Sequence, residues 1–301
     1  MRIAFAGTPA VAVPALEALI AAEHEVRFVI TRPDAPAGRG RVLTPSAVAK
    51  TANEHGLECL KTTALTEIND RIAEVDCVVV VAFGALVPTE LLDVPKHGWI
   101  NVHFSLLPQW RGAAPVQRAI MAGDDVTGVT TFRIDAGLDT GATLGSIATS
   151  IRTGETSGEL LARLSVEGAA LIVATLGGLA DGSIQPVPQP NAGVSLAPKL
   201  AKDDARVNWQ LPALAIERQI RAVTPEPGAW TMAGDERIKL FPLELATEIS
   251  DLSPGEMANR DGHIYVGTGS HAVRLQNVQQ AGRTQVTALQ WFSHKSDVKF
   301  S

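Results

Sequence analysis

Cysteines and aromatic residues are scarce in this chain of 301 residues, which contains two cysteines and only 5% Phe, Trp and Tyr. Two thiols, Cys59 and Cys77, are too few for a disulfide framework or a cysteine-based metal site. Both lie in or beside apolar runs, so we expect reduced core thiols of the kind found in cytoplasmic proteins. The seven histidines are scattered without a second ligand at metal-binding spacing, and we therefore expect no metal site.

Long uninterrupted apolar runs are also missing. Pro9, Pro14 and Glu17 break the apolar N-terminal stretch, which therefore does not fit a secretory signal. Ile172–Leu179 is apolar but too short to cross a membrane. With 46% hydrophobic and 19% charged residues, the composition indicates a soluble globular enzyme, and the length allows two domains. We expect the protein to be cytoplasmic.

An excess of positive charge is absent as well, because 32 acidic residues outnumber 26 basic ones and the net charge is −6. Residues 206–301 are neutral, with ten residues of each sign. A general nucleic-acid-binding protein is basic over its binding face and offers exposed aromatic rings for base stacking. A non-catalytic nucleic-acid-binding protein is therefore a disfavoured alternative. Any nucleic-acid contact must depend on local basic residues, among them Arg218, Arg221 and Lys295.

The first thirty residues are typical of an α/β sheet without a dinucleotide site. Arg2–Ala6 is expected to form a strand, Ala10–Ala22 a helix and Glu25–Thr31 a second strand. Only Gly7 stands in the first connecting turn, where the G-x-G-x-x-G pattern needs three glycines. A nicotinamide-dinucleotide site is therefore disfavoured, although the sheet can still be Rossmann-like.

The rest of the chain predicts two domains of different architecture. Asp76–Ala82 contains four consecutive valines, which indicates a strand buried on both faces at the centre of a parallel sheet. The stretch Asp181–Lys202 is rich in Pro, Gly and Gln, as linkers are, and short alternating runs follow it. We therefore expect a Rossmann-like, mostly parallel α/β sheet domain at 1–182. A linker at 183–205 and a small OB-like β-barrel domain at 206–301 should follow.

The chain is organised around Gly98–Gln117, with the sequence GWINVHFSLLPQWRGAAPVQ. Trp99–His103 alternates like a strand, so Asn101 and His103 should point to one face. The run then breaks into a loop at Pro108. An amide and an imidazole are thereby presented where a buried strand ends, which is where α/β sheets bind ligands. For N-x-H alone, a core histidine and a capping asparagine remain the alternative interpretation.

The sequence INVHFSLLPQWRGAAPVQ resembles the signature of the folate-dependent formyltransferases, and SLLP-x-WRGAAP is most similar to the branch that acts on tRNA. The resemblance runs from FAGTP near the N-terminus to the C-terminal domain. It implies that formyl passes from 10-formyltetrahydrofolate, a donor substrate rather than a tightly bound cofactor, to methionyl-initiator tRNA. It also implies catalytic roles for Asn101, His103 and Asp139, the last in a DAGLDTG loop. From the residues alone, Asp139 and Asp135 would be turn residues, and Asp135 is expected to be structural.

The same resemblance implies that the folate site follows the catalytic strand. Ser105, Leu106, Leu107 and Pro108 would hold the pterin and its linker through backbone groups.

Formyl transfer requires an amine to attack the formyl carbon, donors for the developing oxyanion and a group that handles protons. Asn101 and a protonated His103 are the candidate donors. Asp139 would orient His103 and stabilise its imidazolium. No nucleophilic cysteine or serine is required, because the transfer can be direct.

An arginine-rich loop, RPDAPAGRGRVLTPS, runs from Arg32 to Ser46 and is longer than most βα connections. Gly38 and Gly40 favour a mobile tip that lets Arg39 and Arg41 reach a polyanion. PDxPAGRG is similar to an insertion that the tRNA-directed branch places against the tRNA acceptor arm. Arg39 and Arg41 are therefore candidate tRNA-binding residues, and a solvated surface loop is the alternative.

Some positions depart from the pattern of the resembled family or stay open. Gln109 replaces the usual Arg, Leu196 replaces a frequent Tyr, and Phe83 stands where Tyr is common. Arg111 is equally compatible with a salt bridge that locks its loop and with substrate contact. The nearest rival is a formyltransferase for a small amine, such as an amino-sugar nucleotide or glycinamide ribonucleotide. It would keep the three catalytic residues without needing the basic loop.

Overall fold

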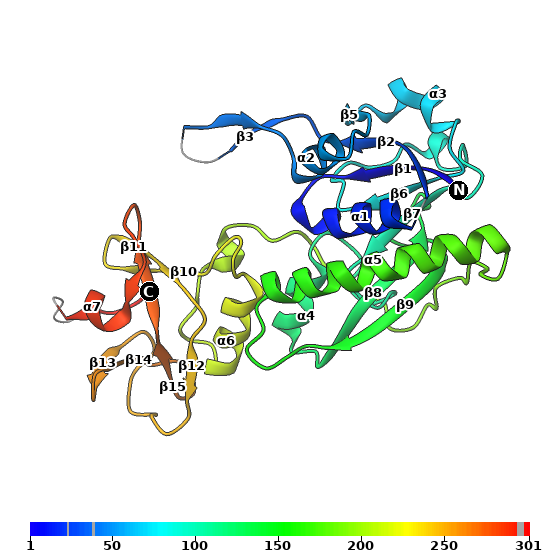
Figure 1. Cartoon of the computed structure of the whole chain (residues 1–301). Helices are drawn as coiled ribbons and strands as arrows, with labels where there is room; N and C mark the ends of the chain where they lie inside the picture. The colour runs from blue at the N-terminus through cyan, green and yellow to red at the C-terminus, as the bar shows by residue number, and fades with distance from the viewer. Residues whose placement is uncertain (23, 38–39, 294–297) are drawn as a thin grey trace. The chain divides into compact units, whose positions relative to one another are not determined.

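The computed structural model describes residues 1–22, 24–37, 40–293 and 298–301 (Figure 1). Arg39 and Lys295, both proposed to contact nucleic acid, lie outside these described residues. The chain forms two compact units that interleave in sequence. Unit 1 comprises Met1–Gly112, Val126–Ser150 and Leu161–Ala197, whereas unit 2 comprises Ala113–Asp125, Ile151–Leu160 and Pro198–Ser301.

Unit 1 is built on a seven-stranded sheet in the order β5-β2-β1-β6-β7-β8-β9. The strands are β1 Arg2–Gly7, β2 Glu25–Thr31, β5 Cys59–Lys61, β6 Cys77–Val81, β7 Trp99–His103, β8 Val126–Arg133 and β9 Thr143–Ser150. The first five in this order pair in parallel, and β8 and β9 are antiparallel to their neighbours. The expected Rossmann-like, mostly parallel sheet is therefore confirmed. The valines of β6 occupy its centre and are buried on both faces, as parallel strands require.

Helices cover both faces of this sheet. Ala4, Ala6, Val78 and Val80 share one face because side chains alternate along a strand, and their cluster also contains Leu65. That face is covered by the short helices after β5 and β6, namely η2 Leu65–Ile68, α3 Asn69–Ile72 and η3 Thr89–Leu91. The remaining helices of the first half of unit 1 are η1 Ala10–Ala12, α1 Val13–Ala21 and α2 Ala47–Glu54. Ser46 caps α2 by accepting a hydrogen bond from the Ala49 N–H.

The long helix α5, Ser157–Asp181, has the length and composition to cross a membrane, with a mean hydropathy of 1.6. The apolar stretch Ile172–Leu179, which is too short by itself to cross a membrane, is therefore part of a longer apolar helix. Leu164 and Leu176 of this helix are fully buried, and Gly168 lies close to Val102 of the sheet. The apolar composition is thus explained by packing against the core of unit 1.

The arginine-rich segment is a β-hairpin rather than the irregular loop that we expected. β3 Ala35–Ala37 pairs antiparallel with β4 Val42–Thr44, and Arg41 lies in the turn with φ 51°. Asp34 at the base of the hairpin forms an ion pair with Lys61. The alternation of small and apolar residues around the turn is weak, which is why the sequence did not reveal the pairing.

Unit 2 is dominated by antiparallel strands, and this confirms the expected change of architecture. Its strands are β10 Trp230–Ala233, β11 Glu236–Leu240, β12 Glu244–Ala246, β13 Met257–Arg260, β14 His263–Val266, β15 Ala272–Leu275, β16 Asn277–Gln280 and β17 Val286–Thr287. They form two four-stranded sheets, β10-β11-β16-β17 and β12-β15-β14-β13. The helical segments are α4 Pro115–Ala122, η4 Asp203–Ala205, α6 Ala213–Ala222 and α7 Ala288–Phe292.

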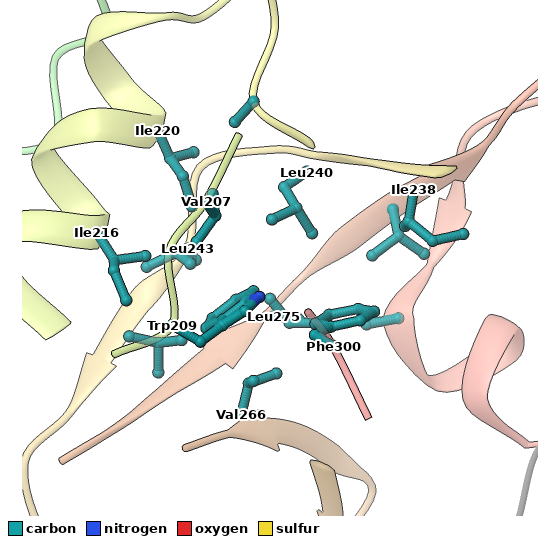
Figure 2. Close-up of a cluster of buried hydrophobic side chains, with 14 of the residues drawn as sticks. Val207, Trp209, Ile216, Ile220, Ile238, Leu240, Leu243, Val266, Leu275 and Phe300 are labelled. Carbon is teal, nitrogen blue, oxygen red and sulfur yellow. The ribbon is translucent and has the colours of Figure 1, made fainter. Parts of the chain in front are cut away.

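One apolar core holds the two sheets of unit 2 together (Figure 2). Ile238 and Leu240 enter it from one sheet, and Val266 and Leu275 enter from the other. Trp209 stacks on Phe300 at 5.4 Å between ring centroids, and its indole N–H donates to the Thr231 hydroxyl at 2.9 Å.

One basic residue of unit 2 is not the exposed candidate that we expected. Arg221 is paired with Glu217 on the same helix and also donates to the Glu155 carbonyl at 2.9 Å. Its side chain is 13% exposed, so it is largely withdrawn from solvent.

Candidate active site

Strand β7 brings Asn101 and His103 to the carboxyl edge of the parallel part of the sheet. Asn101 is in register with Val80 of β6, and His103 is the last residue of its strand. The sheet reverses its winding direction between β1 and β6, so ligands are expected at the carboxyl ends near these strands. Asn101 is half-buried, whereas the His103 side chain is only 6% exposed.

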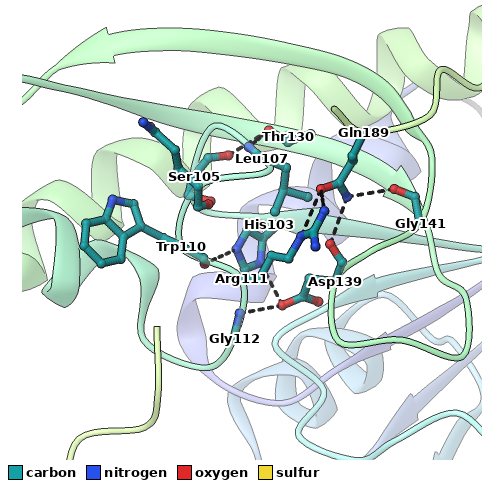
Figure 3. Close-up of polar contacts among 11 residues, drawn as sticks. His103, Ser105, Leu107, Trp110, Arg111, Gly112, Thr130, Asp139, Gly141 and Gln189 are labelled. Atoms are coloured by element: carbon teal, nitrogen blue, oxygen red, sulfur yellow. Dashed lines mark hydrogen bonds and ion pairs between the residues drawn. The ribbon is translucent and has the colours of Figure 1, made fainter. Parts of the chain in front are cut away.

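The two nitrogens of His103 face different groups (Figure 3). Nε2 lies 2.9 Å from the Trp110 carbonyl oxygen, and Nδ1 lies 3.7 Å from Oδ2 of Asp139. A carbonyl can only accept, so Nε2 must carry a proton and donate it. The neutral ring then keeps its lone pair on Nδ1. The atom that gains or loses a proton is therefore Nδ1, the one that faces Asp139.

Burial lowers the pKa of His103, because the charged imidazolium loses solvation inside the protein. The Asp139 carboxylate and the hydrogen bond to the Trp110 carbonyl both act to raise the pKa, but burial is the stronger influence. The structure thus favours a neutral imidazole with a carboxylate beside the nitrogen that accepts a proton.

Asp139 reaches His103 only because its loop folds back along the sheet. β8 runs antiparallel to β7, so His103 pairs with Thr130 and β8 ends opposite Ile100, three residues from His103. The loop after β8 must return over that distance to place Asp139 near the ring. Oδ2 of Asp139 accepts a hydrogen bond from the Gly112 N–H at 2.8 Å.

Two residues that contact His103 have left-handed backbone conformations. Trp110 has φ 60° and Asp139 has φ 51°. For a residue with a side chain this region is unfavourable, and it persists only where the surroundings enforce it. Asp135 stabilises the start of the loop, since its Oδ1 accepts from the Gly137 N–H at 3.0 Å and from the Thr140 hydroxyl at 2.7 Å. These bonds agree with the structural role expected for Asp135.

Residues 187–197, which we call the strap, lie against the active-site loops although their composition resembles a linker. Val187 exchanges two backbone hydrogen bonds of 2.8 Å with Thr143. Farther along, the Ser195 carbonyl accepts from the Arg111 N–H at 2.9 Å, and the Ala197 N–H donates to the Arg111 carbonyl at 2.7 Å. Gly112 has no room for a side chain, because a Cβ there would lie 2.7 Å from the Ala197 carbonyl oxygen.

The Gln189 side chain joins three parts of the site (Figure 3). Its Nε2 donates to the carbonyl oxygens of Asp139 and Gly141, both at 2.8 Å. Its Oε1 accepts from Nε and Nη2 of Arg111 at 3.1 and 2.7 Å. Within the described part of the chain Arg111 therefore locks its loop through a neutral amide rather than through a salt bridge, and this contact leaves its positive charge intact.

The Ser105–Pro108 turn is held rigidly after β7. The Thr130 hydroxyl donates to the Ser105 carbonyl at 2.7 Å and accepts from the Leu107 N–H at 3.1 Å. The Ser105 hydroxyl donates to the Gln109 carbonyl at 2.6 Å, and the Leu106 carbonyl accepts from the Gln109 N–H at 3.0 Å. Much of the backbone that we expected to hold folate is thus already hydrogen-bonded within the protein.

The structure brings together some of the residues singled out in the sequence and separates others. Asn101, His103 and Asp139 converge on the end of β7. Arg41 is exposed in the turn between β3 and β4, and among the described residues no hydrogen bond or ion pair joins it to those three. Sequence reasoning missed Gln189 and the Trp110 carbonyl. The only signal for Gln189 was an amide in a Pro-rich stretch, and a backbone carbonyl leaves no signal in the residue type.

Two protein-family models match the chain, one in its N-terminal part and one in its C-terminal part. The family described as "Formyl transferase" matches residues 1–176, and "Formyl transferase, C-terminal domain" matches residues 199–296. Among the described residues, no group of three or more His, Cys, Asp or Glu side chains is placed to hold a metal ion.

Solved structures with the same fold include two with folate compounds in their descriptions. HypX from Aquifex aeolicus in complex with tetrahydrofolic acid has a TM-score of 0.68 at 19% identity. The match covers 99% of this chain, which spans 50% of HypX. The N-formyltransferase from Helicobacter canadensis, in complex with folinic acid and dTDP-3-aminofucose, has a TM-score of 0.70 at 18% identity. That match covers 91% of this chain and 98% of the other. At these identities the likeness establishes the fold alone.

A relative at much higher identity is the methionyl-tRNA formyltransferase of Streptomyces coelicolor. It is 53% identical over 296 residues, a match that covers 97% of this chain and 96% of the relative. Similarity at this level extends through both units and not just through the β7 motif. On this identity and the two family matches, the chain belongs to the methionyl-tRNA formyltransferases within the formyl transferase family.

Proposed function

We propose that this chain transfers a formyl group from 10-formyltetrahydrofolate to the α-amino group of methionyl-initiator tRNA, a step of translation initiation. We further propose that Asn101, His103 and Asp139 carry the reaction. The observation that supports these roles most directly is the placement of the Asp139 carboxylate 3.7 Å from Nδ1 of a buried histidine at the end of β7. Free Cys59 and Cys77 are in keeping with reaction in the cytoplasm.

His103 handles the proton at Nδ1. The neutral ring accepts a proton from the attacking amine there, because Nε2 is committed to the Trp110 carbonyl. The resulting imidazolium is stabilised by Asp139 and can donate its Nδ1–H toward the oxyanion or the leaving nitrogen. Asp139 thus compensates charge at the moment when His103 acquires it.

Asn101 donates from its amide to the oxyanion that forms on the formyl group. Its side chain makes no hydrogen bond within the described residues and remains half-exposed, so it is available to a substrate. Removing one such donor from an acyl-transfer site typically lowers turnover by about 10²–10³-fold.

The turn formed by Ser105, Leu106, Leu107 and Pro108 binds the pterin and its linker. Because its internal hydrogen bonds fix the backbone, the turn presents a preformed surface. The remaining backbone lone pairs and the apolar side chains of Leu106 and Leu107 make the contacts. Both leucines are partly exposed.

We assign tRNA contacts to Arg39 and Arg41 and to the C-terminal domain. Residues 1–182 form the catalytic domain, residues 183–205 the linker, and residues 206–301 a domain that makes further tRNA contacts. The strap, which is part of the linker, belongs to the same compact unit as the catalytic residues. The exposed Arg41 in the hairpin turn supports this assignment.

The proposed function is tested by formyl transfer from 10-formyltetrahydrofolate to a panel of acceptors. Methionyl-initiator tRNA should be formylated on its amine, and free methionine and uncharged tRNA should not. Efficient formylation of an amino-sugar nucleotide or glycinamide ribonucleotide, without that of methionyl-tRNA, would replace this function with the small-amine alternative.

A further inference from the structure

The hydrogen-bonding capacity of Gln189 is fully used at the active site. A glutamine offers two N–H donors and an oxygen with two lone pairs. In this structure the two donors bind the carbonyls of Asp139 and Gly141, and both lone pairs accept from Arg111. The amide orientation is forced, because carbonyls only accept and a guanidinium only donates.

The hydrogen bond from Gln189 to the Asp139 carbonyl holds a residue of this loop whose backbone conformation is unfavourable for a residue with a side chain. Asp139 has φ 51°, and its loop must return along the sheet from the far end of β8. The Gly112 N–H holds the Asp139 carboxylate, and Gln189 holds the main chain of the same residue. Gly141, the second carbonyl partner of Gln189, is also confined, since a Cβ there would lie 1.7 Å from the Arg133 carbonyl oxygen.

The strap keeps Gln189 itself in place. Val187 pairs with Thr143 two residues before Gln189, and Ser195 and Ala197 pair with Arg111 after it. Gln189 is half-buried between these attachments. Because the strap is attached to the protein on both sides of Gln189, this side chain can hold the loop that it contacts in one position.

We propose that Gln189 is a positioning residue for formyl transfer, which holds the main chain of Asp139 so that its carboxylate stays opposite Nδ1 of His103. The inference rests on the proposed roles of His103 and Asp139. Gln189 does not touch the reacting atoms, and its effect passes through Asp139.

A double-mutant cycle with Gln189→Met and Asp139→Asn tests this proposal on the full-length chain. In the wild-type background Gln189→Met should lower kcat by about tenfold or more, and KM for folate and methionyl-tRNA should change by less than about threefold. In the Asp139→Asn background the same substitution should lower kcat by less than about twofold, because the carboxylate it positions is already gone. Gln185→Met is the matched control, since Gln185 is an exposed glutamine of the same Pro-rich stretch, and it should match wild type.

Gln189→Glu separates the two sides of the amide and serves as a second variant if the Met variant folds poorly. A carboxylate still accepts from Arg111 but cannot donate to the carbonyls of Asp139 and Gly141. The proposal therefore expects Gln189→Glu to lose kcat as Gln189→Met does. Retained kcat in Gln189→Glu would show that the link to Arg111 matters instead, and would overturn the proposal.

Equal losses from Gln189→Met in both backgrounds would also overturn it, since a general structural role reduces activity whatever stands at 139. A wild-type enzyme that does not formylate methionyl-tRNA would contradict the proposed function rather than this inference. The two failures are thus distinguishable in one set of assays.

Discussion

At the scale of single residues, the proposed chemistry depends on which nitrogen of the buried His103 can exchange a proton. The Trp110 carbonyl fixes a proton on Nε2 of His103, and Asp139 faces Nδ1. A carboxylate at 3.7 Å is too distant for a direct hydrogen bond but close enough to stabilise an imidazolium. Burial therefore lowers the pKa of His103 while the Asp139 carboxylate raises it, and burial has the larger effect.

If His103 accepts the proton as proposed, this balance should set the pH dependence of the reaction. Because burial lowers the pKa of His103, the neutral ring persists to a pH below its ordinary value of about 6.5, and kcat/KM should fall only below that pH. Asp139→Asn removes an influence that raises the pKa, so the acid limb of its residual activity should move to still lower pH. Profiles of kcat/KM between about pH 5 and 8 measure both shifts.

The lowered pKa of His103 also makes the stability of the fold depend on pH. Below about pH 6.5 the unfolded chain binds a proton at this histidine that the folded site resists, so His103 should destabilise the fold progressively as the pH falls toward its folded pKa. Unfolding must therefore be monitored alongside activity. An acid limb of kcat/KM above pH 6.5 in a protein that stays folded would contradict the proposed proton acceptor.

At the scale of elements, the strands β3 and β4 hold the two described flanks of the arginine segment against each other. Val42 and Leu43 are exposed at 66% and 68%, and Arg41 stands beside them in the turn. Exposed apolar side chains next to a cation are typical of an interaction surface, and the proposed partner of this one is tRNA.

Arg41→Ala should therefore weaken the use of methionyl-tRNA while leaving folate binding unchanged. A lost phosphate contact should also flatten the dependence of log kcat/KM on log salt concentration by about one unit. Arg27→Ala is the matched control, because Arg27 is an exposed arginine paired with Glu25 on another part of the unit. An Arg41→Ala protein with wild-type rate and salt slope would make this hairpin a solvated surface feature.

Elements with strong periodicity could be predicted from the sequence, and the contacts between distant segments could not. Glu25–Thr31 and Trp99–His103 occur with the expected bounds, because their apolar spacing and their ends were clear. The helix expected at Ala10–Ala22 is instead a short 3-10 segment, η1, followed by α1. The strap was the larger surprise, because a Pro-rich composition indicates only that regular helix is absent and does not say what the chain packs against.

In the candidate site, too, the local arrangement could be predicted from the sequence, and the contacts between distant segments could not. Asn101 and His103 share a strand, so alternation alone places them on one face. The nearness of Asp139 requires the antiparallel β8, whose register no local pattern specifies. The role proposed for Asp139 came from the resemblance of its motif, whereas Gln189 had neither periodicity nor a motif to identify it.

At the scale of the whole molecule, two units interleaved along the chain have separate cores. A folate should bind unit 1 at the carboxyl edge of its sheet and stabilise that unit by mass action. At a hundredfold excess over Kd the gain is about 2.7 kcal/mol, which corresponds to a rise in Tm of about 5 °C or more.

NAD(H) should produce no such rise, since a dinucleotide site needs three glycines here and the sequence has one, Gly7 at the end of β1. Thermal unfolding with each compound, at matched concentrations, makes the comparison. A rise with NAD(H) and none with a reduced folate would reverse the assignment of unit 1.

The central claim is that Asn101, His103 and Asp139 perform formyl transfer to the methionyl amine of tRNA. The most direct measurement follows labelled formyl from 10-formyltetrahydrofolate to methionyl-initiator tRNA in a single turnover, for wild type and for Asp139→Asn. Wild type should place the label on the methionyl amine, and the variant should be slower by roughly 10³-fold or more while remaining folded and able to bind folate. A variant that transfers the label at the wild-type rate would contradict the account.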